Sequence, residues 1–400
     1  MGVGTSSLIQ EKGSPSLKKI AIIGASYLQN PLILKAKELG FETHVFAWQC
    51  GDVGERTADY FYPISIVEKD LILAKCKEIG VDGVCSIGSD LANIVVSYVA
   101  SSMGLVSNTI EATRLSTDKH AMREAFERNG DPSPKSLVVS EGFTLSDSNL
   151  RFPIIVKPAD RSGSRGVTKL DTVDGFDDAV KRAADESFSG VVLAEEFFQG
   201  KEYSVEYISW KGEHYFLSIT EKFTSGAPMF VEKGHLEPAR VDKDVESRVK
   251  CIVEHALNGL GVEYGASHSE LKINNDGEIA IIEIGSRMGG DRIGSDLVSL
   301  STGYDFVGAV VSVAMGQAPQ VPRIQKRNYA AIRYIFDERD LAALTSIKNG
   351  APNLLLEEDV SKFGEHEIVD SSSRFGYFMM QCDSLVELDP YLPDHSEEGL

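Results

Sequence analysis

The sequence has 400 residues, and at about 150 residues per domain this length predicts two to three domains. Hydrophobic residues make up 42% and charged residues 25%, which is typical of globular proteins and excludes a fibrous or disordered chain. Forty basic against sixty acidic residues give a formal net charge of -20, with no basic stripe to offset it. Because such a charge repels phosphate backbones, we expect no nucleic acid partner.

The cysteines and the N-terminal segment predict a cytoplasmic protein. The five cysteines are widely spread and contain no CxxC pair, as expected for reduced thiols rather than a zinc or redox site. Residues 1–17 lack the apolar stretch of a signal peptide, and their Gly, Ser and Pro content predicts a flexible leader. Residues 91–110 are uncharged but too polar to span a membrane, so we expect no membrane partner.

Residues 18–112 alternate strands and helices, which predicts a parallel sheet. The strands are KKIAIIGAS, FETHVFAW and VDGVCSIGSD, with one helix around PLILKAKELG and another that ends in CKEIG. Gly24 follows the first strand, but IIGAS does not complete a GxGxxG motif. We interpret it as a tight strand-to-helix turn rather than a dinucleotide site. Because no catalytic constellation is recognisable here, we predict a supporting domain.

Residues 113–325 consist mostly of strands. A helix over 118–129, with Ser116 or Thr117 as its cap, precedes FPIIVKP, GVTKL, VVLAEEFF, EYSVEYISW and HYFLSIT. Their β-branched and aromatic character predicts an antiparallel region. Further helices are expected near FDDAVKRAAD and VESRVKCIVEHALNGLG, followed by a hairpin over ASHSELKINNDGEIAIIEIGSR. Residues 326–400 are expected to form a small α+β region and contain no recognisable motif.

The hairpin carries a pair of acidic residues. Asp276–Gly277 is a preferred type I′ turn, so residue 275 should pair with residue 278 and, further along the strands, Glu270 with Glu283. Their Cβ atoms would be about 5 Å apart, and facing carboxylates repel unless one is protonated or a cation lies between them. Three alternatives are open: a Mg²⁺ or Mn²⁺ site, a pair that shares a proton as acid and base, or solvated surface glutamates.

A glycine-rich loop, ADRSGSRGV, lies between two predicted strands at 159–167. Gly163 and Gly166 would let backbone N–H groups face a phosphate, and Ser162 and Ser164 would add donors. The alternative is a flexible hairpin loop. Lys157, in the apolar strand before the loop, needs a partner, and a nucleotide phosphate would be a suitable one.

Acidic residues also interrupt the apolar run in LAEEFFQGKEYSVE. They are interpreted either as surface glutamates or as part of a crevice that binds an amino group and hydroxyls. Their position between a phosphate loop and a carboxylate pair favours the crevice.

Lys157, the glycine-rich loop, AEEFFQGKE and the glutamate pair follow one another in an order that resembles the ATP-grasp superfamily, in particular its carboxylate-amine ligases. The resemblance covers residues 18–322 and includes EIGSRMGGD. It implies a mixed α/β and α+β protein with an ATP-grasp fold: an N-terminal parallel-sheet (pre-ATP-grasp) domain at 18–112, an antiparallel-sheet catalytic domain at 113–325 that contains a lid subdomain at about 151–192, and the C-terminal α+β region at 326–400.

The resemblance also implies roles for residues around ATP and magnesium. Lys119 and Lys157 would bind the phosphates, with the loop of Ser162, Gly163, Ser164 and Gly166 closing over them. Glu195, Glu196, Phe197 and Phe198 would form the hinge against adenine, and Glu202 would accept hydrogen bonds from the ribose. Glu270 and Glu283 would hold Mg²⁺ or Mn²⁺. Arg287 would be the catalytic arginine that stabilises the acyl phosphate and the tetrahedral intermediate.

The chain departs from the EINPR motif of many relatives, because Gly285–Ser286 replaces Asn-Pro and removes one metal ligand. The Gly-Ser version resembles the branch that contains L-amino-acid ligases, in which a Glu-x-x-His segment faces the substrates. The resemblance to this branch implies that the substrates contact Glu232, His235, Gly289, Gly290 and Asp291. His268, which shares a strand face with Glu270, is a further predicted substrate-binding residue.

The expected activity is an ATP-dependent, ADP-forming carbon-nitrogen ligation. A small carboxylate would be activated as an acyl phosphate and attacked by an amine, with amino acids as the expected substrates. The alternatives are a ligase of a sugar or nucleotide intermediate, like the glycinamide ribonucleotide synthetases, and a non-catalytic ATP sensor. A homodimer is usual among proteins that share this resemblance.

Overall fold

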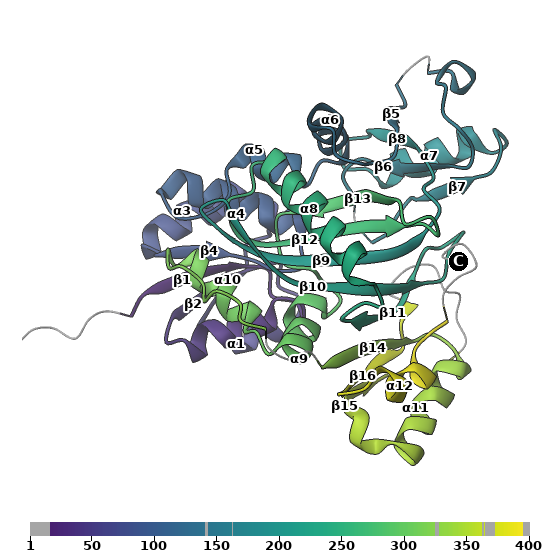
Figure 1. Ribbon diagram of the computed structural model, residues 1–400. Helices are drawn as coiled ribbons and strands as arrows, with labels where there is room; N and C mark the ends of the chain where they lie inside the picture. Colours follow the sequence, from purple (N-terminus) through teal and green to yellow (C-terminus); the bar gives the residue numbers. More distant parts are fainter. Residues whose placement is uncertain are drawn as a thin grey trace, which may run out of the picture.

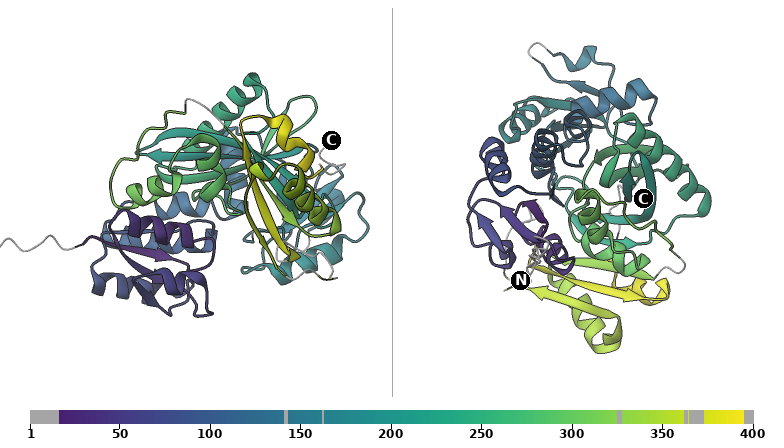
Figure 2. Two further views of the ribbon diagram at one scale, coloured as in Figure 1. Left: turned by 90° about the horizontal axis from the view of Figure 1, so that it is seen from below. Right: turned by 90° about the vertical axis from the view of Figure 1, so that its left-hand side faces the viewer.

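The computed structural model describes residues 17–140, 143–161, 163–324, 328–361, 364 and 373–394. Its strands form two four-stranded sheets and one eight-stranded sheet. Figures 1 and 2 show the N-terminal parallel unit on one side of the large sheet, and a smaller sheet that projects from the other end. Residues 1–16 of the predicted leader and the loop residue Ser162 lie outside the described residues.

The N-terminal sheet is parallel, as predicted, with strand order β3-β2-β1-β4. Its strands are β1 (Lys19–Ile23), β2 (Glu42–Phe46), β3 (Tyr60–Tyr62) and β4 (Gly83–Cys85), and the helices of this part are α1 (Asn30–Glu38), α2 (Val53–Thr57), α3 (Lys69–Ile79), α4 (Asp90–Met103) and α5 (Ile110–Leu115). Helices cover both faces, so β1 is an almost continuous buried apolar run. The strand β3 is too short for the sequence pattern to have indicated it.

The smaller sheet is antiparallel and has the order β5-β8-β6-β7. Its elements are β5 (Ser136–Val138), the 3₁₀ turn η1 (Leu145–Asp147), β6 (Ile154–Pro158), β7 (Thr168–Leu170), α7 (Phe176–Glu186) and β8 (Val192–Glu196). The apolar side of α7 packs on this sheet through Phe176, Ala179 and Ala183. The predicted lid segment, residues 151–192, therefore belongs to this smaller sheet. The first strand of the sheet, β5, lies before residue 151 in the chain.

Helix α6 (Lys119–Asn129) precedes the smaller sheet, and its cap differs from the prediction. Asp118, rather than Ser116 or Thr117, is the N-cap, because its carboxylate accepts hydrogen bonds from the N–H groups of His120 and Ala121. An aspartate at this position satisfies two otherwise unpaired donors.

The large sheet has the order β13-β12-β9-β10-β11-β14-β16-β15. Its strands are β9 (Lys201–Trp210), β10 (Glu213–Thr224), β11 (Glu232–Glu237), β12 (Tyr264–Ile273), β13 (Ile279–Gly285), β14 (Tyr329–Ile335), β15 (Leu355–Val360) and β16 (Gly376–Cys382). The helices of this part are α8 (Lys243–Gly259), the π-helical turn η2 (Ile293–Leu297), α9 (Val298–Thr302), α10 (Phe306–Ala314), α11 (Glu338–Gly350), η3 (Pro352–Leu354), α12 (Leu385–Leu388) and η5 (Asp389–Tyr391). The last three strands belong to the predicted C-terminal region, so this region extends the large sheet instead of forming a sheet of its own.

Helices α6 and α8 cover one face of the large sheet and enclose an apolar core with Tyr203, Val205 and Tyr207 of β9. Helix α10 packs between the large sheet and the N-terminal sheet, where its Val310 shares a core with Ile20 and Ile208. Among the described residues, no helix is both long and apolar enough to cross a membrane. All five cysteines are free thiols.

The β12–β13 hairpin pairs Glu270 with Glu283, as predicted, but by a different route. Asn274 pairs with Glu278, and its side-chain oxygen accepts hydrogen bonds from the N–H groups of Asp276 and Glu278. The connection is therefore a three-residue loop with Gly277 at φ 78°, not the predicted two-residue turn. A β-bulge between this turn and Glu270 then shifts the register by one residue and restores the predicted pair.

Candidate active site

One face of the large sheet is polar in its central strands. Along β9, residues 203, 205 and 207 enter the apolar core, so the alternating residues Glu202, Ser204 and Glu206 face the other way. The register places Lys272, Glu270 and His268 of β12 opposite them on one side and Lys222 of β10 on the other. Strand periodicity thus gathers charged side chains over one surface.

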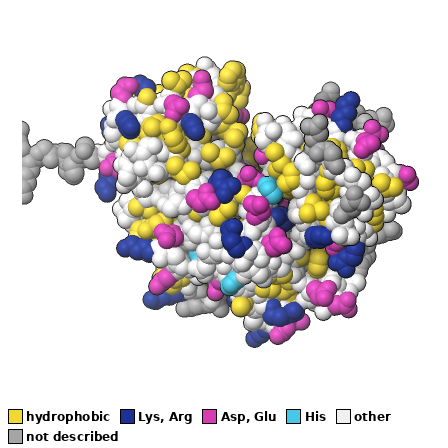
Figure 3. All heavy atoms as spheres, turned by 90° about the horizontal axis from the view of Figure 1, so that it is seen from above, with side chains coloured by type: hydrophobic (Ala, Val, Ile, Leu, Met, Phe, Trp, Pro, Cys, Tyr) yellow, Lys and Arg dark blue, Asp and Glu magenta, His cyan; other side chains and the backbone are white. Residues whose placement is uncertain are grey.

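A cavity of about 370 Å³ lies against this polar face. Figure 3 shows a face of the molecule on which a hollow separates two lobes and acidic and basic side chains are interspersed. The predicted residues that line the cavity are Lys119, Lys157, Gly163, Ser164, Glu195, Glu196, Phe197, Phe198, Glu202, Glu232, His268, Glu270, Glu283, Arg287, Gly290 and Asp291. Three other predicted residues, Gly166, His235 and Gly289, are not part of its lining, and Ser162 is outside the described residues.

The carboxylates of Glu270 and Glu283 are balanced by lysines. Lys119 Nζ lies 2.8 Å from Glu283 Oε2, and Lys222 Nζ lies 2.7 Å from Glu270 Oε1. Burial favours the protonated form of Glu270, but Lys222 and His268 hold its pKa well below the usual range. Both carboxylates line the cavity and offer the hard oxygen donors that Mg²⁺ and Mn²⁺ prefer. The carboxylate oxygens of Glu270 and Glu283 therefore fit a divalent cation, which would compete with Lys119 and Lys222 for these oxygens.

Lys157 belongs to a buried cluster of charges. Its Nζ lies 2.5 Å from Glu195 Oε2, and Arg123 Nε lies 2.9 Å from Glu195 Oε1. Burial lowers the pKa of Lys157 to about 8, although Glu195 opposes this. Burial raises the pKa of Glu195, but Arg123 and Lys157 outweigh it and lower that pKa to about 2. The Glu195 carboxylate thus anchors the lysine.

The pairing of Arg123 with Glu195 predicts a large stability effect. Arg123→Met should lower the free energy of unfolding by about 3–5 kcal/mol, because it leaves a buried carboxylate with only one cation. Urea denaturation followed by circular dichroism measures the change. Arg128→Met, on an exposed part of the same helix, is the matched control. Equal stability of the two variants would show that the buried pair is not required.

The predicted adenine hinge has several charged neighbours. Glu196 pairs with Arg151 at 2.7 Å. The ring of Phe197 has the ammonium groups of Lys169 and Lys272 at 4.9 and 4.5 Å from its centroid. Lys272 also lies 3.2 Å from Glu202, so one lysine connects the predicted ribose ligand with the hinge.

His268 is fixed between two carboxylates. Its Nδ1 contacts the fully buried Glu206, and its Nε2 lies 3.3 Å from Glu270. Burial lowers the pKa of His268, but the two carboxylates outweigh it and raise that pKa to about 9. A Cβ atom on Gly289 would lie 2.6 Å from His268 Nδ1, so glycine is required beside this ring.

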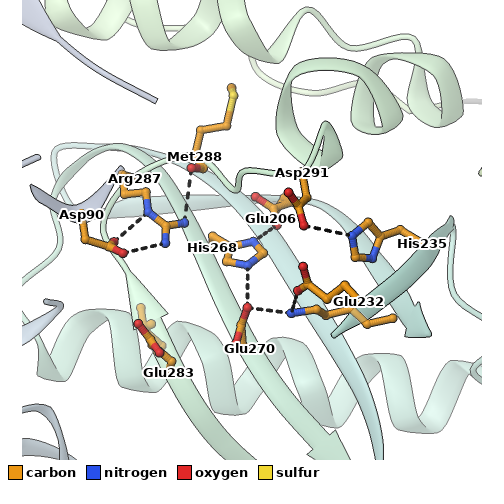
Figure 4. Close-up of polar contacts among 12 residues, drawn as sticks. Asp90, Glu206, Glu232, His235, His268, Glu270, Glu283, Arg287, Met288 and Asp291 are labelled. Carbon is orange, nitrogen blue, oxygen red and sulfur yellow. Dashed lines mark hydrogen bonds and ion pairs between the residues drawn. The ribbon is translucent and has the colours of Figure 1, made fainter. Parts of the chain in front are cut away.

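Glu232 and His235 face the same side of β11 because of a β-bulge. Thr224 pairs with Glu232 and Lys222 with His235, with one extra residue, Lys233, between them. Lys222 Nζ lies 2.8 Å from Glu232, whose carboxyl group is also hydrogen-bonded to Asp291. Figure 4 shows Glu232, His235 and Asp291 converging beside His268 and Glu270.

Arg287 is held by the N-terminal domain. Its Nε and Nη2 donate to the two carboxylate oxygens of Asp90 at 2.7 and 3.1 Å (Figure 4). Asp90 begins α4, the next element after β4, and Leu28 follows the adjacent strand β1. Both line the cavity, as expected for a ligand crevice at the carboxyl ends of neighbouring parallel strands. The N-terminal domain, predicted as a supporting domain, thus contributes Leu28 and Asp90 to the lining of the cavity.

The predicted site residues omitted several charged residues of this site, among them Asp90, Arg123, Glu206, Lys222 and Arg374. For two of them a signal exists. Arg123 lies four residues after Lys119, on the same helix face. Glu206 continues the alternation that begins at Glu202. Asp90, Lys222 and Arg374 carry no local pattern that separates them from surface charges.

Comparison with known proteins gives one family and several relatives. Residues 150–296 match the family model of the ATP-grasp domain. Alanine–anticapsin ligase of Bacillus subtilis (strain 168) is 28% identical over 212 residues, which cover 47% of this chain and 44% of that relative. D-Alanine–D-alanine ligase of Hydrogenovibrio crunogenus is 26% identical over 204 residues, which cover 48% of this chain and 60% of the relative. The match thus spans about half the length of these curated relatives.

Solved structures share the whole architecture. An L-amino acid ligase from Bacillus licheniformis superposes with a TM-score of 0.79 at 22% identity, covering 94% of this chain and 96% of that one. A phosphoribosylglycinamide synthetase from Anaerococcus prevotii gives a TM-score of 0.74 at 21% identity, covering 93% and 96%. These likenesses confirm the predicted fold class. The chain therefore carries an ATP-grasp domain at residues 150–296.

Proposed function

We propose that the protein is an ATP-dependent, ADP-forming ligase that joins the carboxylate of one amino acid to the amine of another. One observation carries the proposal. A single cavity brings together two lysines suited to phosphates, the carboxylate pair Glu270 and Glu283, and an arginine. Glu232 and Asp291 add an acidic wall beside them.

The reaction needs a carboxylate oxygen to attack the γ-phosphorus of ATP, with ADP as the leaving group. A Mg²⁺ ion held by Glu270 and Glu283 would neutralise phosphate charge. Lys119 and Lys157 would bind the phosphates, and Arg287 would stabilise negative charge on the acyl oxygen. The amine then attacks the acyl carbon, the C–O bond to phosphate breaks, and the amine loses a proton.

The acidic wall supports an amino-acid substrate. Glu232 and Asp291 would attract an ammonium group, whereas a phosphorylated sugar or nucleotide needs unpaired basic residues. The basic residues nearest this wall, Lys222 and Arg374, already contact its carboxylates. The resemblance to alanine–anticapsin ligase and D-alanine–D-alanine ligase is consistent with this choice.

The lowered pKa of Lys157 predicts a pH-dependent affinity for ATP. Below about pH 8 the ammonium is charged and would bind phosphate; above this pH the free protein loses the proton. The dissociation constant of a non-hydrolysable Mg–ATP analogue should therefore rise by up to about tenfold per pH unit above pH 8. Calorimetric titration measures it. The Lys157→Arg variant, which stays charged, should show a flatter profile, and identical profiles would contradict the role of Lys157.

The function is tested by phosphate release from ATP with Mg²⁺ across a matrix of amino acids, offered singly and in pairs. We expect release that needs two amino acids, produces ADP and a dipeptide, and stops when the metal is chelated. ATP binding without stimulation by any pair would overturn the proposal. Phosphorylated amines with glycine would then test the sugar or nucleotide alternative, and an absence of turnover would favour an ATP sensor.

A further inference from the structure

The C-terminal region contacts the candidate active site at the segment of Asp291 and Arg292. These two residues have φ angles of 50° and 61°, so both adopt the left-handed conformation that side chains disfavour. Two consecutive residues in this conformation need outside contacts to hold them.

Those contacts come from β14, β15 and β16, and from Arg374, which lies just before β16. The Tyr334 hydroxyl donates to the backbone oxygen of Asp291 at 2.8 Å. Arg374 donates to both carboxylate oxygens of Asp291, at 3.0 and 2.8 Å. Arg292 pairs with Glu357 of β15 at 3.1 Å and contacts the Tyr377 hydroxyl of β16. Each residue of the segment thus has partners in the C-terminal strands.

Arg374 is itself fixed in orientation. Its guanidinium carbon lies 3.5 Å from the centroid of the Tyr334 ring, and its side chain is only 11% exposed. It also lies 3.4 Å from a carboxylate oxygen of Glu232. A planar guanidinium can stack on a ring and bind a carboxylate through two donors together, which an ammonium cannot do.

Arg374 does not line the cavity, whereas Asp291 and Glu232 do. We propose that Arg374 is a positioning residue, which holds Asp291 and Glu232 in place as the acidic wall of the cavity. The C-terminal region thereby becomes part of the active site. The expected effect of Arg374 on the KM for amino acids rests on the proposed function.

The first test is kinetic and uses the full chain. Arg374→Lys should raise the KM for the amino-acid substrates by about 10- to 100-fold, as expected when a partner that orients a site residue is lost. The KM for ATP should change by less than about twofold, because Arg374 contacts none of the predicted ATP ligands. Tyr334→Phe, which keeps the ring and loses the hydrogen bond to Asp291, should raise the amino-acid KM by about fivefold. Arg339→Lys, on an exposed arginine of α11, is the control.

The second test does not depend on turnover. Hydrogen–deuterium exchange in peptides that cover residues 288–297 should be faster in Arg374→Lys than in the wild type, while exchange in 193–198 stays the same. Unchanged exchange in 288–297, or an equal rise in the KM values for ATP and amino acids, would overturn the positioning role. If the wild type turns over with no pair of amino acids, the proposed function fails, and exchange alone decides whether Arg374 holds the segment.

Discussion

Glu283→Gln is expected to reduce amino-acid-dependent ADP release by about 1,000-fold, because a metal ligand is worth several kcal/mol of transition-state stabilisation. Glutamine keeps the size of the side chain and can still accept a hydrogen bond from Lys119, which lies 2.8 Å away in the wild type. The substitution removes the charge and leaves the local packing. The measurement is the steady-state rate at several concentrations of Mg²⁺ and Mn²⁺.

The metal titration separates two explanations of this loss. If Glu283 binds the cation, a higher metal concentration should recover part of the rate. If it only orients Lys119, the loss should be independent of the metal. Glu278→Gln, at the exposed turn of the same hairpin, should leave the rate unchanged. A Glu283→Gln variant with full activity would remove the carboxylate pair from the mechanism.

Arg287→Lys is expected to lower kcat by about 100- to 1,000-fold, the usual effect of losing one donor that stabilises developing negative charge. Lysine keeps the positive charge, but it cannot form the two-donor contact that Arg287 makes with Asp90. The affinity for Mg–ATP should change by less than about twofold. Single-turnover kinetics on the ATP-saturated enzyme measure the chemical step directly.

Asp90→Asn is a second variant that tests the role of Arg287, with a smaller expected effect on kcat. It keeps the shape of the carboxylate and weakens the hold on Arg287, so its kcat should lie between those of the wild type and Arg287→Lys. Arg248→Lys, an exposed arginine of α8, is the control for the loss of a guanidinium. Wild-type kcat in Arg287→Lys would show that this arginine does not act on the reacting groups.

The β12–β13 hairpin shows which features of strand pairing a local turn motif predicts correctly and which it does not. The pairing of Glu270 with Glu283 was predicted correctly, yet both the turn and the register next to it were wrong. The side chain of Asn274 sets the three-residue loop, and the bulge cancels the resulting shift. Neither feature has a signal strong enough to be read from the Asp276–Gly277 pair alone.

The sequence by itself determined the type of the elements with a clear periodicity, such as β9, and the order of the site residues. Alternation in β9 separates Tyr203, Val205 and Tyr207 from Glu202 and Glu206, because successive side chains of a strand face opposite sides. The order of Lys157, the glycine-rich loop and the two glutamates indicated an ATP-grasp domain, and the family match over residues 150–296 confirms it.

Only the tertiary structure decided which charges meet. Asp90 and Arg287 are 197 positions apart in the chain, and Arg374 and Asp291 are 83 apart. Local periodicity says which face of an element a side chain occupies, but not which other element packs against that face. A buried charge must find an opposite charge wherever packing brings one, so its partner depends on the whole fold. The contributions of the N-terminal domain and of the C-terminal strands to this site were therefore visible only in three dimensions.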